Sequence, residues 1–341
     1  MILKEYLLEK VKTKKLPGIA IAYLTEDSNY YLNVGYNGFK EYVSERQAVD
    51  SNTLYDLASL TKVVSTTTLI LKLIELDYFT LETKVKEILP QFKYDNVTIK
   101  HLLTHTSGLP ADDKKYKECH SASEMWEFTL NQPQIFEPGT KVEYSDFGYI
   151  ILGKIIEHFE MNIEEYANKI IFKPLEMNST AYNPYTKGLQ NTCAPTEVTD
   201  ERGTIRGIVH DGKALKLNGL SGNAGLFSNT KDLTKFVRMI LNDGYPILGK
   251  ESIDLFKQCL TPGLNESRTI GWMFNDVNSP VYNVGSNNAI WHTGFAGGSI
   301  YVDFDSKKAV ITLTNRVHPS RENDISEIRK EIHKMLLNNE N

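Results

Sequence analysis

The sequence predicts an α/β fold of the α+β type, with one antiparallel sheet built from both ends of the chain. Short apolar runs typical of strands lie in residues 19–34 and 298–314. Between them, Pro and Gly divide the chain into helical segments, and helical patterns also open and close the chain. The most economical architecture is a sheet flanked by the two terminal helices, with a mostly helical region inserted.

The first elements in order are a helix and a hairpin. Residues 1–13 place Leu3, Leu7, Leu8 and Val11 on one side of a helix, and Pro17-Gly18 ends it. The runs 19–24 and 30–34 are separated by turn-forming residues, which predicts two antiparallel strands. A long helix then opens at Ser59. Its apolar and small residues recur at helical spacing, so we expect it to be buried on most sides.

The middle of the chain is predicted to be helical. Thr98 is placed to cap a short helix that reaches residue 103, and residues 147–159 form a clear helix with four buried isoleucines. Residues 186–225 are rich in Gly, Asn and Thr, which predicts a loop. A capped helix follows at residues 233–241.

The C-terminal part returns to strands, at residues 298–303 and 309–314, and a last helix follows Pro319. We therefore divide the chain into a sheet domain formed by residues 1–80 and 200–341 and an inserted helical domain formed by residues 81–199. The active site is expected at the interface between them.

Composition excludes several classes of protein. The 341 residues are 41% hydrophobic and 24% charged, as in soluble globular proteins. A net charge of -5 without a basic tract argues against a nucleic-acid partner. The three cysteines lie far apart, which fits reduced thiols. We see neither a signal peptide nor a membrane span, so the default expectation is a cytoplasmic protein without a membrane partner.

Ser59 and Lys62 form the first candidate for chemistry. Residues three apart on a helix share a face, so both side chains can point into one pocket. A serine hydroxyl becomes a nucleophile when a neighbouring group takes its proton, and a desolvated amine can assist that transfer. The S-x-x-K pattern alone also fits a capping serine followed by a solvated lysine.

Two further segments align with the first: Tyr144-Ser145-Asp146 before a helix, and His292-Thr293-Gly294 at the start of a predicted strand. Together they resemble the serine β-lactamase and penicillin-binding protein superfamily, which carries S-x-x-K, Y-x-N and K-T-G or H-T-G in this order. The resemblance extends from about residue 17 to residue 315. It is closest to the branch of class C β-lactamases, D-alanyl-D-alanine carboxypeptidases, D-aminopeptidases and class VIII esterases, through residues 56–63, 101–110, 222–228 and 292–295.

The resemblance implies a β-lactamase/transpeptidase-like fold and a role for each matching residue. Ser59 would be the acylated nucleophile, and Lys62 would lie between Ser59 and Tyr144. Either Tyr144 or Lys62 would take the Ser59 proton, which the sequence leaves open. The backbone N–H groups of Ser59 and Phe295 would form the oxyanion hole. Asp146, together with the triplet that begins at His292, would contact the substrate.

Two residues depart from the usual motifs. Asp146 stands where the family usually has Asn, which would raise the pKa of Lys62 and add negative charge to the pocket. His292 stands where β-lactamases usually have Lys, and a neutral imidazole attracts a carboxylate less than an ammonium does. We therefore expect neutral esters to be preferred over β-lactams and D-Ala-D-Ala peptides, unless another basic residue such as Arg316 supplies the charge.

Other tempting residues have simpler interpretations. His101 and His105 are spaced like zinc ligands, but no third ligand is evident, so we expect no metal and no cofactor. His210 and Asp211 are interpreted as an internal pair that shapes the pocket rim. Trp291 is predicted to lie in the core, near the site because His292 follows it.

The sequence therefore predicts a serine hydrolase that acts through an acyl-serine intermediate on carboxylic esters or small D-amino-acid amides and peptides. A D-Ala-D-Ala carboxypeptidase or β-lactamase is the alternative within the same class. The alternative from another class is a non-catalytic relative that binds cell-wall peptide or a protein partner. Intact Ser59, Lys62 and Tyr144 argue against it. The oligomeric state is not readable from the sequence.

Overall fold

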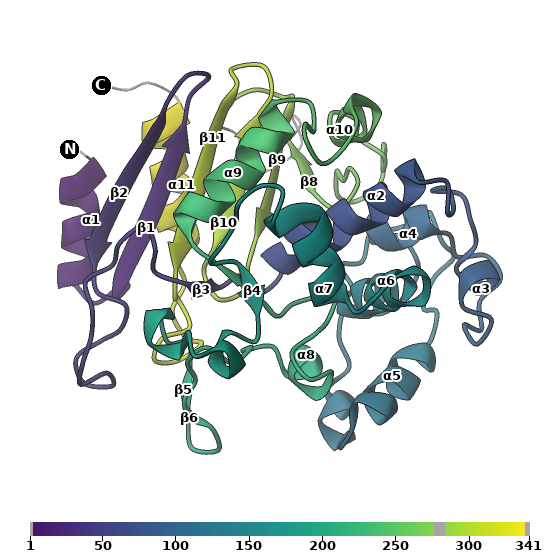
Figure 1. Ribbon diagram of the computed structural model, residues 1–341, viewed down its shortest axis with the longest axis horizontal. Coiled ribbons are helices and arrows are strands. Elements are labelled where there is room, and N and C mark those ends of the chain that lie inside the picture. Colours follow the sequence, from purple (N-terminus) through teal and green to yellow (C-terminus); the bar gives the residue numbers. More distant parts are fainter. Residues whose placement is uncertain (1–2, 276–283, 338–341) are drawn as a thin grey trace.

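The computed structural model describes residues 3–275 and 284–337, and its main element is an antiparallel sheet (Figure 1). Among these residues, six strands join in the order β2-β1-β11-β10-β9-β8, with every neighbouring pair antiparallel. The strands are β1 Gly18–Leu24, β2 Asn29–Gly35, β8 Met273–Asn275, β9 Ala289–Thr293, β10 Ser299–Asp303 and β11 Lys308–Thr314. The predicted sheet with contributions from both chain ends is confirmed.

The central strands are buried on both faces. Along β1, Ile19 and Ile21 pack in one hydrophobic cluster, whereas Ala20 and Ala22 pack in another, because successive side chains point to opposite faces. Helices α1 Leu3–Lys12 and α11 Ser326–Leu337 belong to the first cluster, and α9 Thr230–Leu241 covers the second face (Figure 1). The predicted terminal helices and the pairing of β1 with β11 are therefore present in the structure.

The helical region lies beside the sheet (Figure 1). Its helix α6, Asp146–Phe159, is buried along most of its length. Around it lie α2 Thr68–Glu75, α3 Val85–Ile88, α4 Ile99–Leu103, α5 Ala122–Leu130 and α7 Ile163–Ala167, together with the 3-10 turn η2 Lys114–Glu118 and the π-helical turn η3 Asn168–Phe172. Thr98 caps α4, as predicted.

The helix that follows Ser59 differs from the expected regular α-helix. Its first part, η1 Lys62–Thr67, is π-helical, and only then does α2 begin. All six residues of η1 are buried. A π-helical turn rotates side chains relative to an α-helix, and such turns are frequent at functional sites.

The predicted loop at 186–225 is wrong in part, because short elements interrupt it. They are the 3-10 turns η4 Pro184–Lys187 and η5 Gln190–Thr192, the hairpin of β5 Val198–Thr199 with β6 Gly203–Thr204, and the helix α8 Gly212–Lys216. A small sheet joins β3 Tyr55–Asp56, β7 Leu226–Ser228 and β4 Ala181–Tyr182. Helix α10 Lys250–Phe256 precedes β8. The division into two domains at residues 80 and 200 stays a prediction.

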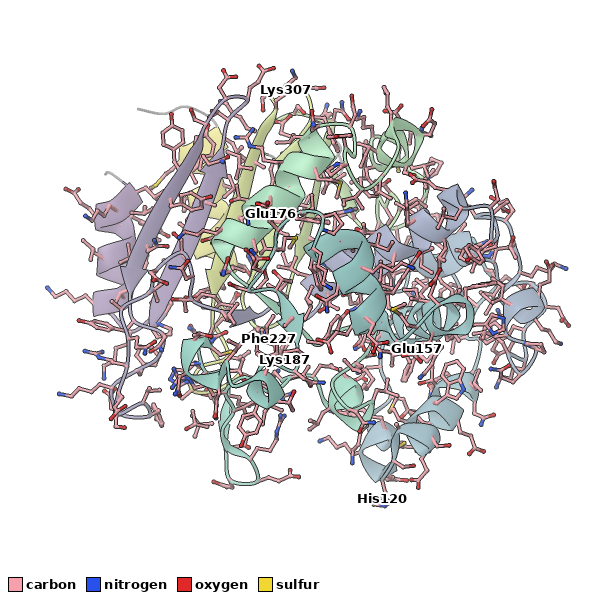
Figure 2. The ribbon with its side chains drawn as sticks, viewed as in Figure 1. His120, Glu157, Glu176, Lys187, Phe227 and Lys307 are labelled. Atoms are coloured by element: carbon pink, nitrogen blue, oxygen red, sulfur yellow. The ribbon has the colours of Figure 1, made fainter. Side chains whose placement is uncertain are left out.

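Ion pairs join segments that are distant in sequence. Lys307, labelled at the top of Figure 2, pairs with Glu26 and so links the β10–β11 turn to the β1–β2 turn. Lys187 pairs with Glu164 at 2.7 Å, which links η4 to α7. The three cysteines are free thiols. In the described part of the chain, no helix is both long and apolar enough to cross a membrane.

Candidate active site

The turn before Ser59 is strained and held in place by a buried carboxylate. Ala58 has φ +46°, in the left-handed region that residues other than glycine seldom adopt. The Asp56 carboxylate accepts hydrogen bonds from the N–H of Ala58 at 2.8 Å and of His210 at 2.7 Å. This turn fixes Ser59 at the wall of the pocket, and strained backbone of this kind recurs at functional sites.

Lys62 is fully buried and uses all three of its N–H donors. Its Nζ donates to Ser59 Oγ at 3.0 Å, to Asp146 Oδ1 at 2.8 Å and to the Asn223 carbonyl at 3.0 Å. Burial acts to lower the pKa of Lys62, but the charges of Asp146 and then Tyr144 outweigh it, so the pKa lies above its usual value. A charged Lys62 has no lone pair with which to accept the Ser59 proton.

Tyr144 lies between two cations, just before α6. Lys62 Nζ is 4.9 Å from the centroid of its ring, and the Arg268 guanidinium carbon is 5.3 Å from it. The His105 ring packs against the same ring with centroids 4.4 Å apart, and its Nδ1 accepts from the N–H of Ser145 at 3.0 Å. Within the described chain the buried Tyr144 hydroxyl has no partner in full hydrogen-bond geometry, and the group that interacts with it is the Lys62 ammonium. Tyr144 is thus the hydroxyl-bearing side chain that lies beside both Lys62 and Arg268 at the site.

The third motif lies at the end of β9, so its predicted place at the start of a strand is wrong. His292 Nδ1 donates to the Thr293 carbonyl at 2.9 Å. Burial, and then the charge of Arg268, hold the pKa of His292 well below its usual value, so the ring is neutral at pH 7. A Cβ on Gly294 would lie 2.3 Å from the Leu57 carbonyl oxygen. Only glycine therefore lets the end of β9 approach the turn before Ser59.

The proposed oxyanion donors are available. Neither the Ser59 N–H nor the Phe295 N–H donates a hydrogen bond to another described residue, and both residues line the pocket. Free N–H groups at a pocket wall can stabilise an oxygen that gains negative charge.

Asp146 is paired with a second lysine that the sequence analysis missed. Lys213 Nζ lies 3.1 Å from Asp146 Oδ2 and 2.7 Å from Asp112 Oδ1. Burial acts to raise the pKa of Asp146, but Lys62 and Lys213 outweigh it and lower the pKa. Asp146 raises the pKa of Lys62, as expected, and the negative charge that it adds to the pocket is paired with Lys62 and Lys213. Lys213 lies in the segment predicted to be loop, where no pattern singles it out.

Arg268 is the second residue that the sequence analysis missed. It is buried, it lines the pocket, and its Nε and Nη2 both donate to Glu266 Oε2 at 2.9 Å. Its Nη1 has no hydrogen-bond partner in the described part of the chain. Arg316, named from the sequence as a source of charge, instead donates to the Phe295 and Asn323 carbonyls. Arg268 is thus the cation placed beside Tyr144.

These residues surround a cavity of about 560 Å³. Six predicted site residues line it, namely Ser59, Tyr144, Asp146, His292, Thr293 and Phe295. Lys62 and Gly294 lie directly behind this lining, through the contacts given above. Trp291 also lines the pocket, as expected from its place next to His292. The predicted set is therefore brought together around one cavity.

One histidine, His210, has a different partner from the one predicted. His210 pairs with Glu197 at 2.9 Å and not with Asp211, which instead caps α8. His210 and Asp211 both line the pocket. His101 takes part in the N-cap of α4. No group of three or more His, Cys, Asp or Glu side chains able to hold a metal occurs among the described residues.

Comparison with known proteins shows similarity along nearly the whole chain. The sequence model of the family named Beta-lactamase matches residues 3–333. A Bacillus subtilis (strain 168) protein named "N-acetylmuramyl-L-alanine amidase" is 28% identical over 92% of this chain and 80% of its own length. A Salmonella agona (strain SL483) protein named "Putative D-alanyl-D-alanine carboxypeptidase" is 32% identical over 79% of this chain and 70% of its own. The solved structure of simvastatin synthase from Aspergillus terreus superposes with a TM-score of 0.79 at 18% identity, covering 99% of this chain and 98% of that one.

Proposed function

The chain belongs to the Beta-lactamase family, and we propose that it is a serine hydrolase that forms an acyl intermediate on Ser59. The observation that carries the proposal is the contact of the buried, charged Lys62 with Ser59 Oγ at 3.0 Å, together with its interaction with the Tyr144 hydroxyl. Ser59 as nucleophile, Lys62 as cation and Tyr144 as candidate base are thus brought together at the pocket.

In the proposed reaction Tyr144, as phenolate, takes the Ser59 proton while Ser59 Oγ attacks the substrate carbonyl carbon. The carbonyl oxygen becomes an oxyanion that the N–H groups of Ser59 and Phe295 stabilise. When the C–N or C–O bond breaks, Tyr144 returns the proton to the leaving group. Water then attacks the acyl-Ser59 ester by the same route, which releases the acid and restores the serine. Lys62 keeps its proton and stabilises the charge on Tyr144.

The substrate class within this proposal is a small D-amino-acid amide or peptide with a carboxylate beside the reacting carbonyl. Asp146 is paired with two lysines, and Arg268 lines the pocket with a buried Nη1 that has no hydrogen-bond partner among the described residues. Arginine binds carboxylates well because its donors match their geometry. The name of the Salmonella agona relative, a putative D-alanyl-D-alanine carboxypeptidase, supports the same class, and the name of the Bacillus subtilis relative supports cleavage of an amide.

A neutral carboxylic ester is the second candidate. Met273, Trp291 and Phe295 give the pocket apolar walls, and Phe295 is exposed, which suits an alkyl or aryl group. The non-catalytic alternative, a protein that binds cell-wall peptide, would need no activated serine.

Covalent labelling tests the reaction. Intact-protein mass spectrometry after treatment with a fluorophosphonate, and separately with a penicillin, should show one adduct, and peptide mapping should place it on Ser59. Ser59→Ala should remove both the adduct and the turnover of every substrate. An unlabelled wild-type chain, or a Ser59→Ala variant that keeps its activity, would reject the acyl-enzyme mechanism and favour the peptide-binding alternative.

Substitution of Arg268 tests the substrate class. Arg268→Met should lower kcat/KM for a D-Ala-D-Ala peptide at least tenfold, since the lost pairing is worth about 1.5 kcal/mol or more. A short-chain p-nitrophenyl ester, which has no carboxylate, serves as the internal control and should change less than threefold. Equal losses for both substrates would indicate that Arg268 supports Tyr144 and does not select the carboxylate.

A further inference from the structure

We propose that Lys213 is a positioning residue of the active site, which holds one oxygen of Asp146 so that the other oxygen stays on Lys62. The inference rests on the proposed function and deepens it. It explains how this chain accommodates Asp146 at the place where the family motif usually has an amide.

The first observation is a continuous chain of alternating charges. Lys62 Nζ contacts Asp146 Oδ1 at 2.8 Å, and Lys213 Nζ contacts Asp146 Oδ2 at 3.1 Å and Asp112 Oδ1 at 2.7 Å. The two lysine side chains are only 0% and 6% exposed, so both ammonium groups depend on these contacts for most of their hydrogen bonds. Two ammonium groups and two carboxylates sum to zero charge, and the charges lead from the buried Lys62 to Asp112, whose side chain is 49% exposed.

The second observation is that Lys213 is fixed from several sides. Asp211 Oδ1 caps α8 by accepting the N–H of Ala214 at 2.8 Å, and it also accepts from Asn223 Nδ2 at 3.1 Å. The same Asn223 gives its carbonyl oxygen to Lys62 at 3.0 Å. The segment that carries Lys213 is therefore tied to Lys62 by a second route, independent of Asp146.

Aromatic packing adds a third restraint. Lys213 Nζ lies 5.0 Å from the centroid of the Tyr116 ring and 5.9 Å from that of Phe147. A Cβ on Gly212 would lie only 2.3 Å from the Tyr116 hydroxyl oxygen, so Tyr116 packs directly on the backbone beside Lys213. Cation–π contacts of this kind favour a desolvated ammonium over a neutral side chain.

The chemistry of the carboxylate explains why a second lysine is needed. An asparagine at residue 146 would be neutral, and one oxygen would be enough to accept from Lys62. A carboxylate has a second oxygen that must also be satisfied when it is buried, and an unmet charge there is costly. Without Lys213, Asp146 would turn both oxygens toward Lys62 and draw its ammonium away from Ser59. The need for Lys213 should therefore depend on the negative charge of Asp146.

The test is a double-variant cycle with Lys213→Met, Asp146→Asn and the combination of both. Lys216→Met, on the same helix but without a contact to the site given above, is the matched control. The readouts are the rate of Ser59 labelling by a fluorophosphonate, kcat and KM for a short-chain p-nitrophenyl ester, and the melting temperature Tm.

We expect each single variant to slow labelling and lower kcat at least tenfold, with KM changed less than threefold. The double variant should recover to within threefold of the wild-type rate, because a neutral amide needs no second cation. Lys216→Met should match the wild type. If a variant lost activity only because it was less stable, its Tm would fall and the double variant would not regain the wild-type labelling rate or kcat.

Two outcomes overturn the inference: a Lys213→Met variant with normal labelling and kcat, or a double variant no faster than the slower single variant. If Lys213→Met does not fold, Lys213→Gln takes its place in the same cycle and the same outcomes decide. Absence of labelling in the wild type is a different result, since it rejects the proposed function itself. Normal wild-type labelling without recovery in the double variant rejects only the role of Lys213.

Discussion

At the scale of single residues, the protonation states of Lys62 and Tyr144 decide which of them can take the Ser59 proton. The sequence leaves this choice open. In the structure Lys62 donates to Ser59, Asp146 and Asn223, and its raised pKa keeps it charged near neutral pH. Tyr144 has two cations against its ring, and its hydroxyl interacts with the Lys62 ammonium. These contacts favour Tyr144 as the base, which stays a prediction.

Removal of one oxygen tests this assignment. Tyr144→Phe keeps the ring and its packing, and we expect kcat to fall by two or more orders of magnitude, about 3 kcal/mol of barrier. Tyr149→Phe is the matched control: its hydroxyl lies 3.3 Å from both Thr67 Oγ1 and the Leu103 carbonyl, so its loss should lower Tm and leave kcat nearly unchanged. A Tyr144→Phe enzyme with normal kcat would transfer the role of base to Lys62.

At the scale of elements, close packing of α6 positions the groups around Lys62. A Cβ on Gly153, in α6, would lie 2.9 Å from the Gly222 backbone nitrogen. Gly222 accepts a hydrogen bond from Thr66 Oγ1 at 2.7 Å, and the next residue, Asn223, gives its carbonyl to Lys62. The glycine therefore lets α6 approach the segment that holds the lysine. The sequence alone shows only a glycine in a helical pattern.

Two alanine substitutions in α6 separate the close approach of Gly153 to Gly222 from the general effect of helix propensity. Gly153→Ala should lower Tm and reduce kcat, because the backbone at Gly222 must shift and carry Asn223 away from Lys62. Gly148→Ala, whose Cβ would meet nothing closer than 3.6 Å, should leave kcat unchanged and raise stability by up to about 1 kcal/mol. Thermal unfolding and steady-state kinetics of both variants provide the check. Equal behaviour of the two variants would disprove the packing argument.

At the scale of the whole molecule, buried histidines make stability depend on pH. Burial is the main cause that holds the pKa of His105, His292 and His318 below the usual value, and it lowers that of His333 to about 3. The unfolded chain protonates its histidines near pH 6.5. Below that pH the unfolded state binds more protons than the folded state, so the free energy of unfolding falls as the pH falls.

His333 provides the clearest measurement, since it is fully buried between α11 and the sheet, with its ring centroid 5.5 Å from that of Tyr301. Its share of the loss between pH 7 and pH 5 is about 2 kcal/mol. His333→Leu should therefore show a smaller decrease in Tm over this range than the wild type. His120→Leu, on the exposed loop labelled in Figure 2, should keep the wild-type pH dependence. An unchanged pH dependence in His333→Leu would contradict the expected shift.

The sequence by itself determined the elements and the order of the motifs. Local periodicity was enough to predict the hairpin of β1 and β2, helix α6, and the last two strands, because alternation and helical spacing are short-range properties. Ser59, Lys62 and Tyr144 were recognisable because they lie in short motifs of known order. The domain boundaries and the roles of the site residues stay predictions. The predicted loop at 186–225 failed because a five-residue helix such as α8 is too short for a periodic signal.

Only the tertiary structure decided the electrostatics of the site. Lys62 and Asp146 are 84 residues apart in the sequence. Lys213 and Arg268 line the same cavity, although no sequence motif links either residue to the site. The strength of an electrostatic interaction depends on burial and on every neighbouring charge. The sequence shows Asp146 without its partners, whereas in the structure its carboxylate pairs with Lys62 and Lys213. The expected preference for neutral esters rested on that carboxylate and on the neutral His292. Folding brings Lys213 and Arg268 to the pocket, because the packing of helices and strands decides which side chains meet there, and the sequence spacing does not.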